Sequence, residues 1–293
     1  MLRLALSTNA ETFERLREPL ADRGIEVGHL QVKQRAIQLT NRERTDHEPV
    51  DRFDVGFVFP GRLMEGTAIN ALHKLPWVNS REDVLTSRNK GGVIAALDSA
   101  DIPVPESVMV SNPVDEAVVT DAVDELSFPV VVKPNSATRG VGVAKAADLD
   151  SLLGIVDYLN LIHDYRATGD KSYLIQEYLP DARDYRVMVV DGECVGGVER
   201  RLPDALAEGR WKHNVHRGAE ATGIAVPTEH RRLAEAVAAE LGISYLGVDL
   251  LATDGRLVVN ETNARPTVDE ATKYDDGFYD RLAELIRRTA VDS

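Results

Sequence analysis

Short apolar runs alternate with amphipathic segments along the first 80 residues. The apolar runs predict strands, and the spacing of Phe13, Leu16 and Leu20 predicts a helix. The predicted strands are Leu2–Ser7, Ile25–Leu30, Asp54–Phe59 and Trp77–Asn79, and the predicted helices are Glu11–Asp22 and Gly66–Leu75. Residues 31–52 are polar and receive no assignment. This alternation is typical of a small doubly wound α/β unit.

The middle of the chain continues the mixed pattern. A helix is predicted from about Ser87 to Ala100, where Pro103 and Pro105 stop it. The other predicted elements are the strands Glu106–Val110, Phe128–Lys133, Val143–Ala146 and Tyr173–Gln176 and the helices Val114–Leu126 and Leu149–Leu161.

From Tyr185 the pattern becomes that of an antiparallel sheet. The predicted strands are Arg186–Val190, Val195–Arg201, Tyr245–Ala252 and Leu257–Asn260, joined as two hairpins through Asp191-Gly192 and Asp254-Gly255. Helices are predicted over Thr228–Leu241, with Thr228 as the cap, and over about Phe278–Arg288. The fold class is therefore α/β (α+β), and we expect domains over residues 1–88, 89–176 and 177–293.

The charge composition limits the kinds of binding partner to expect. The 293 residues include 34 Lys and Arg against 48 Asp and Glu, a formal net charge of −14. Nucleic acid and anionic membranes attract basic surfaces, so neither is expected as a partner. Only 8 of the cations are lysines, a skew that resembles proteins of salt-loving (halophilic) organisms and that draws attention to each lysine.

The chain shows no sign of a membrane span or a disulfide framework. Its apolar opening is seven residues long, too short for the core of a signal peptide. Cys194 is the only cysteine, which excludes an intrachain disulfide, and we expect it to be a small buried residue in a strand. A cytoplasmic protein is expected, and a homo-oligomer stays open.

A lysine ends the second strand predicted in the middle region, and two glycines lie in the loop after it. Lys133 ends an apolar strand, where an ammonium must meet an anion or reach solvent. Gly140 and Gly142 would let the backbone approach a ligand and turn its N–H groups to phosphate oxygens. Because Lys133 precedes the glycines, this is not the Walker pattern. By itself the segment fits a hairpin with an exposed lysine equally well.

Two carboxylates and an amide lie on the last hairpin. A three-residue loop, Asp254–Arg256, would place Asp249 opposite Glu261, and period-two alternation puts Asn263 on the same face. Opposed carboxylates repel unless a cation lies between them. Hard oxygen ligands of this type suit Mg²⁺, or alternatively Mn²⁺, on nucleotide phosphates. The other reading is a strand-end Asp and an unrelated surface Glu.

A third candidate for ligand binding is the segment that follows the strand ending at Gln176. Its backbone could meet the edge of an adenine, Tyr178 or Leu179 could pack on the base, and Asp184 could accept hydrogen bonds from ribose hydroxyls. Alone, this segment fits a plain hinge better.

The order of these three features resembles that of the RimK-like glutamate ligases, members of the ATP-grasp superfamily. The matching segments, from about Trp77 to the end of the chain, are WVNSRED, SRNK, IPVPES, PVVVKP, ATRGVGV, QEYLPDARDYRV, VERR, KHNVHRGA, GVDLL and NETNARP. The region they span is more than half of the chain, and they come in the family's order. The resemblance implies an N-terminal pre-ATP-grasp domain, a small lid domain and a C-terminal ATP-grasp domain, with ATP between the last two.

The resemblance also implies site residues. The residues that match the family's nucleotide site are Lys90, Lys133, Thr138, Gly140, Gly142, Glu177, Tyr178, Leu179, Asp184, Lys212 and Asn214. The lysines and the glycine loop would contact phosphates, residues 177–179 the adenine, and Asp184 the ribose. Lys212 stands where the family has an arginine. Asp249, Glu261 and Asn263 match the family's metal ligands.

The implied chemistry is phosphoryl transfer from ATP to a carboxylate and attack of an amine on the acyl phosphate. Arg201 and Arg217 are candidate positive groups for that transfer, although Arg201 also fits a surface strand. Where the family has a short Ser-Pro after the metal asparagine, this chain has Arg265, whose guanidinium could hold a substrate carboxylate. The expected partners are a small-molecule or peptide carboxylate and an amino-acid amine such as glutamate.

Other functions stay open beside this one. Two alternatives are enzymes: a dipeptide-forming ligase of the D-alanine type and an unrelated small-molecule amide ligase. A third alternative is a regulatory protein that binds ATP without turnover. The paired carboxylates Asp249 and Glu261 speak against the regulatory protein, which would not need them.

Overall fold

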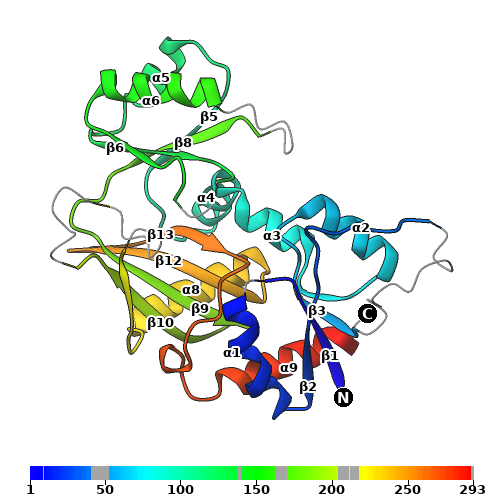
Figure 1. The fold of residues 1–293 in the computed structure, drawn as a ribbon. Coiled ribbons are helices and arrows are strands. Elements are labelled where there is room, and N and C mark those ends of the chain that lie inside the picture. The colour runs from blue at the N-terminus through cyan, green and yellow to red at the C-terminus, as the bar shows by residue number, and fades with distance from the viewer. Residues whose placement is uncertain are drawn as a thin grey trace.

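The computed structural model describes residues 1–8, 10–40, 53–137, 140–162, 170–203, 211 and 218–291. Their strands form three sheets of four, five and four strands (Figure 1). In the view of Figure 1 the small antiparallel sheet lies at the top, the five-stranded sheet below it, the N-terminal sheet to the right, and helix α4 (Lys90–Ser99) between them. The predicted mixed α/β class is confirmed, whereas the domain boundaries stay a prediction.

The N-terminal sheet is parallel and doubly wound, as predicted. Its strands are β1 (Leu2–Leu6), β2 (Ile25–His29), β3 (Val55–Val58) and β4 (Trp77–Asn79), in the order β2-β1-β3-β4. Leu4 and Leu6 join a core with α1 (Ala10–Ala21) and α9 (Phe278–Val291), whereas Ala5 joins a core with Ile69 of α2 (Leu63–His73). Because alternate strand residues face opposite sides, helices cover both faces. The strand order reverses between β1 and β3.

The top sheet is antiparallel and carries the predicted lysine loop. Its order is β5-β8-β6-β7, built from β5 (Ser107–Ser111), β8 (Ser172–Glu177), β6 (Val130–Pro134) and β7 (Ala144–Ala146). Its core includes residues of α5 (Glu116–Ala122) and α6 (Leu149–Ile162). Lys133 lies at the end of β6, immediately before the loop that returns as β7.

The five-stranded sheet is antiparallel and has two different faces. Its order is β11-β10-β9-β12-β13, built from β11 (Glu220–Gly223), β10 (Glu193–Arg201), β9 (Arg183–Val190), β12 (Tyr245–Thr253) and β13 (Arg256–Asn263). One face packs against α8 (Thr228–Leu241) through Val187, Val189 and Leu246. On the other face, Met188 and Tyr245 pack against the N-terminal unit and α9. This second face continues into the predicted site.

The helix predicted from about Ser87 to Ala100 is present as α4, but it begins three residues later, and a separate helix that was not predicted precedes it. α3 (Arg81–Arg88) begins with a capping box of Ser80 and Asp83, and α4 begins after Asn89, whose side chain accepts a hydrogen bond from Gly92 N at 3.1 Å. The side chain of Asn89 thus competes with helix continuation. The break makes Lys90 the first residue of α4 and directs it toward β13.

Two smaller expectations also change. α8 begins at Thr228 as predicted, but its capping position is Pro227, with no side-chain cap. β11 and the short 3₁₀ helix Ala271–Lys273 were not predicted. Cys194 is buried in β10 and free, as predicted.

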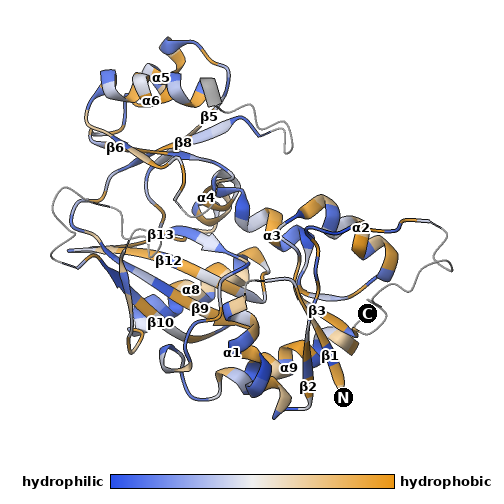
Figure 2. Cartoon of the chain, viewed as in Figure 1, coloured by the Kyte–Doolittle hydropathy of each residue, from blue (hydrophilic) through white to orange (hydrophobic). Residues whose placement is uncertain are grey.

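Hydropathy follows this layering. Figure 2 shows hydrophobic positions gathered in the strands and on helix sides turned to the sheets, with hydrophilic positions on the outer turns and loops. Among the helices in the described part of the chain, none is long and apolar enough to cross a membrane.

Candidate nucleotide and metal site

The predicted metal carboxylates lie on the β12–β13 hairpin. Its turn, Asp254-Gly255, has two residues and not the predicted three, because Thr253 pairs with Arg256. Without an interruption, this ladder would place Asp249 opposite Asn260. Glu261 would then lie on the other face of the sheet from Asp249.

A β-bulge corrects this register. It leaves Asn260 as an extra residue in β13, so that Asp249 faces Glu261, as predicted. The amide oxygen of Asn260 then accepts a hydrogen bond from Lys133 Nζ at 2.7 Å. The bulge therefore joins the two carboxylates on one face and also connects β13 to the lysine of the top sheet.

Asp249 is held by two arginines that the sequence reasoning missed. Arg186 on β9 donates from Nε and Nη2 to its two oxygens at 2.6 and 2.8 Å, and Nη2 of Arg200 on β10 lies 3.0 Å from Oδ2. Burial acts to raise the pKa of Asp249, but the two guanidinium groups outweigh it and hold that pKa below its usual value. The carboxylate is therefore ionised, although it is only 5% exposed.

Arg200 reaches the site through a second bulge, at Gly196 in the β9–β10 hairpin. The ladder shifts there by one residue, so that Arg200 pairs with Asp184. Without the shift, Arg201 would share the face of Asp184. Gly196 has φ of +141°, and a Cβ on it would come within 2.5 Å of the Lys273 carbonyl oxygen. The structure thus brings Arg200 to the carboxylates and turns the predicted Arg201 to the opposite face.

Asp184, predicted to meet the ribose, is bonded to Arg200. Its Oδ1 accepts from Nε at 3.0 Å and from Nη2 at 2.5 Å. Burial raises the pKa of Asp184 to about 6 against the opposing effect of Arg200, and the nearby charge of Asp249 adds to the rise. Both bonds end on Oδ1, so a ribose hydroxyl could donate to Oδ2 with Arg200 still in place. The ribose contact stays a prediction.

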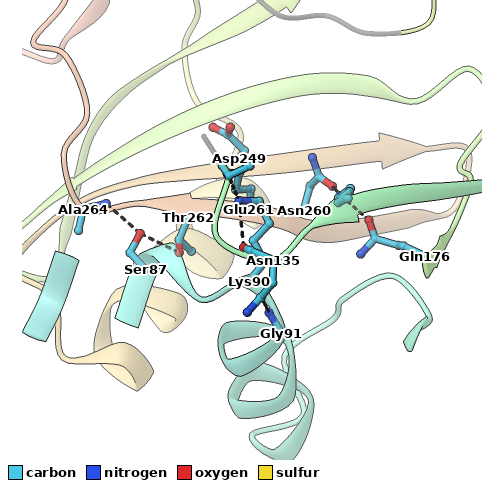
Figure 3. Close-up of polar contacts among 12 residues, drawn as sticks. Ser87, Lys90, Gly91, Asn135, Gln176, Asp249, Asn260, Glu261, Thr262 and Ala264 are labelled. Carbon is cyan, nitrogen blue, oxygen red and sulfur yellow. Dashed lines mark hydrogen bonds and ion pairs between the residues drawn. The ribbon is translucent and has the colours of Figure 1, made fainter. Parts of the chain in front are cut away.

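Lys90 connects the lid loop to Glu261 (Figure 3). Its Nζ lies 3.1 Å from Glu261 Oε1 and donates to the carbonyl oxygens of Ala137 and Asn135 at 2.5 and 3.5 Å. A cation on the first residue of a helix is disfavoured by the helix dipole, and Lys90 is only 7% exposed. An anion is therefore needed beside it, and Glu261 fills that place in this structure.

Lys133 is buried against neutral oxygen atoms. Its Nζ donates to Oε1 of Gln176 and to Oδ1 of Asn260, and Gln176 is itself oriented by a 2.8 Å hydrogen bond to Ser107 Oγ. Burial lowers the pKa of Lys133 to about 8, although the charge of Glu261 acts in the opposite direction. A buried ammonium with amide partners would gain strongly from a phosphate beside it.

We expect ATP binding to weaken as the pH rises through about 8, because only the charged form of Lys133 attracts phosphate and its pKa is lowered to about 8. Bound phosphate favours the charged form, so binding slightly above this pH should take up a proton. Calorimetry in buffers of different ionisation enthalpy measures that uptake. In Lys133→Arg the cation stays charged and the pH dependence should disappear. An affinity of the wild-type protein that stays constant through this pH would contradict the assignment.

The loop after β6 holds both predicted glycines in left-handed conformations. Gly140 has φ of +66° and Gly142 of +75°. A Cβ on Gly142 would come within 2.7 Å of Pro134 Cγ. Both observations agree with a loop whose backbone can approach a ligand. Thr138, the other predicted contact in this loop, lies outside the described residues.

The predicted adenine connector begins where β8 ends. The Glu177 carboxylate accepts from Arg256 at 2.7 and 2.9 Å and from Glu106 N at 2.9 Å, and the bond from Arg256 lowers its pKa. The Glu177 side chain therefore connects the top sheet to β13. Its backbone groups would be the ones to meet the edge of an adenine base. Leu179 is half-buried.

Tyr178 belongs to an aromatic cluster. Its ring lies 5.8 Å from that of Trp211, nearly perpendicular to it, and Lys145 Nζ lies 4.5 Å from the Tyr178 centroid and 5.6 Å from that of Trp211. Neither Lys145 nor Trp211 was predicted here. The cluster supplies a flat, partly apolar surface next to the connector.

Asn263 and Arg265 connect the metal site to the N-terminal unit. Asn263 lies opposite Gly247, and its Oδ1 accepts from Arg265 N at 2.9 Å. The Arg265 guanidinium donates to the carbonyl oxygens of Phe59 and Ser7, the latter from Nη2 at 3.3 Å. Arg265 therefore lies beside the N-terminal sheet, next to a predicted metal ligand.

The predicted metal ligands fit a divalent cation in charge and donor type. Among the described residues, no group of three or more His, Cys, Asp or Glu side chains could hold a metal, so the predicted set depends on the Asn263 amide as its third donor. Glu261 and Asp249 already attract three cationic side chains, from Lys90, Arg186 and Arg200. Mg²⁺ suits such oxygen donors, provided that the arginines release Asp249.

The predicted phosphate-side residues Lys212 and Asn214 and the predicted catalytic Arg217 lie outside the described residues. Around Lys90, Asn260 and Glu261 the described residues leave a cavity of about 10 Å³, room for one water molecule.

Sequence reasoning missed Arg186, Arg200, Gln176 and Asn260. A signal existed for Arg186, which follows Asp184 by two residues and so shares its face. The other three depend on the two bulges and on the approach of the lid, which no spacing in the sequence reveals.

Comparison with known proteins agrees with this geometry. The RimK-like ATP-grasp domain family matches residues 87–281. A probable alpha-L-glutamate ligase of Methanococcoides burtonii is 26% identical over 90% of this chain and 86% of its own length. One of Shewanella halifaxensis is also 26% identical over 89% of this chain, which spans only 57% of that relative. The crystal structure of a RimK domain ATP-grasp protein from Sphaerobacter thermophilus matches with a TM-score of 0.70 at 22% identity, over 99% of both chains. The chain belongs to the RimK-like ATP-grasp family, which confirms the predicted fold and the predicted class of ATP-dependent ligase.

Proposed function

We propose that this protein uses ATP to join a carboxylate to an amine, with release of ADP and phosphate. The observation that carries the proposal is the convergence of cations on the carboxylates of β12 and β13. Lys90 of α4, Lys133 of β6 and the arginines of β9 and β10 all reach this place. Four cations thus surround the three carboxylates Asp184, Asp249 and Glu261, an excess of positive charge that suits a polyphosphate.

Within this proposal each residue has a part in positioning charge. Lys90, Lys133 and the N–H groups of the loop with Gly140 and Gly142 hold the phosphates. Asp249, Glu261 and Asn263 would hold Mg²⁺ or Mn²⁺, which when bound supplies positive charge beside the phosphate oxygens.

Arg186 and Arg200 are the proposed cations for the transferring phosphoryl group. If Asp249 held the metal, their guanidinium groups would be available to stabilise the charge on the phosphoryl oxygens.

The proposed reaction has two steps, as the family resemblance implies. A carboxylate oxygen of the acceptor attacks the γ-phosphorus, and the bond from that phosphorus to the bridging oxygen breaks, so that ADP leaves. The amine nitrogen then attacks the carbonyl carbon of the acyl phosphate, phosphate leaves with the bonding electron pair, and the nitrogen loses a proton. Enclosure of the acyl phosphate protects it from water.

The substrates are proposed from the relatives. Two relatives of this chain are named probable alpha-L-glutamate ligases. We therefore propose glutamate as the first amine to test, and a small-molecule or peptide carboxylate as the acceptor. We propose the cytoplasm as the place of the reaction, because ATP is supplied there.

Addition of ATP should change the fluorescence of Trp211. Its ring lies on Tyr178, where the adenine is proposed to bind, so an incoming base alters its surroundings. The chain has only two tryptophans, so Trp77→Phe leaves Trp211 as the sole reporter. A titration with ATP should move its emission, and Tyr178→Ala should reduce both the change and the affinity. No change on saturation with ATP, shown by calorimetry, would place the base elsewhere.

A screen for ADP release tests the function. Purified protein, ATP and Mg²⁺ are combined with amino acids and carboxylic acids, singly and in pairs, at high salt because of the acidic surface. ADP should appear only when both an acceptor carboxylate and an amine are present. ATP binding without ADP release across the whole screen would favour a regulatory ATP-binding protein.

A further inference from the structure

The backbone that follows β13 is held by a buried asparagine of the N-terminal sheet. Asn79, the last residue of β4, is fully buried. Its Nδ2 donates to the carbonyl oxygens of Tyr245 and Ala264 at 2.6 and 2.7 Å, and its Oδ1 accepts from Tyr245 N at 3.1 Å. The reversed amide would place its oxygen against two carbonyl oxygens, so these partners fix its orientation.

Ser87, in the last turn of α3, holds the same segment from another side (Figure 3). Its Oγ accepts from Ala264 N at 2.9 Å and from Thr262 Oγ1 at 3.2 Å, and both hydroxyl groups belong to buried residues. Because α3 follows β4 directly and begins with a capping box, Asn79 and Ser87 lie on one short continuous piece of structure. From its two ends they bond to the N–H and the carbonyl oxygen of Ala264.

One peptide group transmits the position of Asn79 to Asn263. The carbonyl oxygen of the peptide between Ala264 and Arg265 accepts from Asn79, and the N–H of the same peptide donates to Asn263 Oδ1 at 2.9 Å. A peptide group is planar, so the direction of its carbonyl fixes that of its N–H. The side-chain oxygen of Asn263 is thereby oriented, and one of its two lone pairs stays available for a cation.

Asn79 adds direction to a contact that is otherwise built from apolar side chains. Next to it, the rings of Phe57 on β3 and Tyr245 on β12 lie 4.8 Å apart within the core beneath the N-terminal sheet. An apolar side chain at position 79 could extend this core without the cost of burying an amide. It could not, however, fix the direction of a backbone carbonyl group.

We infer that Asn79 and Ser87 are positioning residues for the metal site, which set the place and the direction of the Asn263 amide. The inference rests on the proposed role of Asn263 as a metal ligand. Asn263 is the last residue of β13 to pair with β12, so the sheet itself gives no support beyond it. Removal of a group that orients a metal ligand typically lowers metal affinity about 10- to 100-fold.

Calorimetry with adenylyl imidodiphosphate, an ATP analogue that is not hydrolysed, tests this role without turnover. Its affinity is measured with and without Mg²⁺, and the ratio of the two reports the contribution of the metal. Asn79→Ala should lower this ratio about tenfold. The affinity without Mg²⁺ should change little, because Lys90 and Lys133 remain. A folded Asn79→Ala protein with the wild-type ratio would overturn the inference.

Asn70→Ala is the matched control for a loss of stability. Asn70 of α2 accepts a hydrogen bond from Trp77 Nε1 at 2.9 Å, and Trp77 lies on the same strand as Asn79. This variant should lower the melting temperature and keep the wild-type Mg²⁺ ratio. An equal fall of the ratio in both asparagine variants would show general destabilisation, and the inference would be wrong.

Ser87→Ala decides the matter if Asn79→Ala does not fold. It removes one hydroxyl that Ala264 N and Thr262 use, and it should lower the Mg²⁺ ratio about fivefold. Ser99→Ala is the same change in α4, where the hydroxyl bonds within its own helix, and it should leave the ratio unchanged. A wild-type ratio in Ser87→Ala would overturn the inference, because both side chains are assigned the same segment.

These measurements separate the inference from the proposed function. A lowered Mg²⁺ ratio in Asn79→Ala, in a protein that never releases ADP with any substrate pair, would leave the positioning role standing and sink the ligase. ADP release by variants that keep the wild-type ratio would do the reverse. An analogue affinity of the wild-type protein that does not depend on Mg²⁺ would remove the metal site and the positioning role together.

Discussion

Replacement of Glu261 by glutamine should lower kcat for ADP formation by at least about a thousandfold. Glutamine keeps the shape of the side chain and an oxygen for Lys90 but removes the charge that would hold the metal. The Glu261 side chain is about one-third exposed, so the fold should tolerate the change. ATP binding should fall far less, because Lys90 and Lys133 remain. Single-turnover assays measure the first effect, and calorimetry with ATP measures the second.

Glu199→Gln provides the matched control. Glu199 lies on β10 of the same sheet, but it forms a surface pair with Arg183. The chemical change is identical, and the rate of ADP formation should stay within about twofold, because surface pairs contribute little. A Glu261→Gln enzyme that retains a tenth or more of the wild-type rate would remove Glu261 from the metal site.

Replacement of Asp249 by alanine should destabilise the fold by about 3–5 kcal/mol. The reason is that Arg186 and Arg200 would lose their shared carboxylate, and Arg200 would keep only Asp184. Urea unfolding at neutral pH measures the loss. Mg²⁺ should not restore stability in this variant, because its predicted ligand is absent.

Asp54→Ala is the control for this experiment. Asp54 pairs with Arg3 at the surface, where both side chains are 40% exposed, and its removal should cost less than about 1 kcal/mol. A similarly small cost for Asp249→Ala would mean that water reaches Arg186 and Arg200, and that the arginines are not held in place by Asp249.

The two β-bulges mark the limit of what sequence could predict. The pairing of Asp249 with Glu261 was predicted correctly, but from a three-residue turn that does not exist. A two-residue turn and a bulge at Asn260 give the same pairing. In the β9–β10 hairpin the bulge at Gly196 exchanges Arg201 for Arg200 at the site. Strand registers follow from turns, whereas bulges also depend on distant contacts, such as that of Gly196 with Lys273.

Other parts of the site were predictable for physical reasons. Lys133 stood out because an ammonium ends an apolar strand, and its environment is indeed buried. Gly140 and Gly142 stood out because positive φ angles favour glycine, and both have them. The break between α3 and α4 was missed because the apolar spacing around Asn89 is that of a continuous helix. In the structure the side chain of Asn89 caps the first turn of α4.

The most direct test of the ligase is the fate of oxygen in the acceptor carboxylate. The acid that supports ADP release is labelled with ¹⁸O in the reacting carboxyl group and turned over once with ATP and the amine. An acyl phosphate transfers one carboxylate oxygen to phosphorus, so each released phosphate should carry one ¹⁸O, with ADP unlabelled. Unlabelled phosphate, or label found in AMP, would contradict the account.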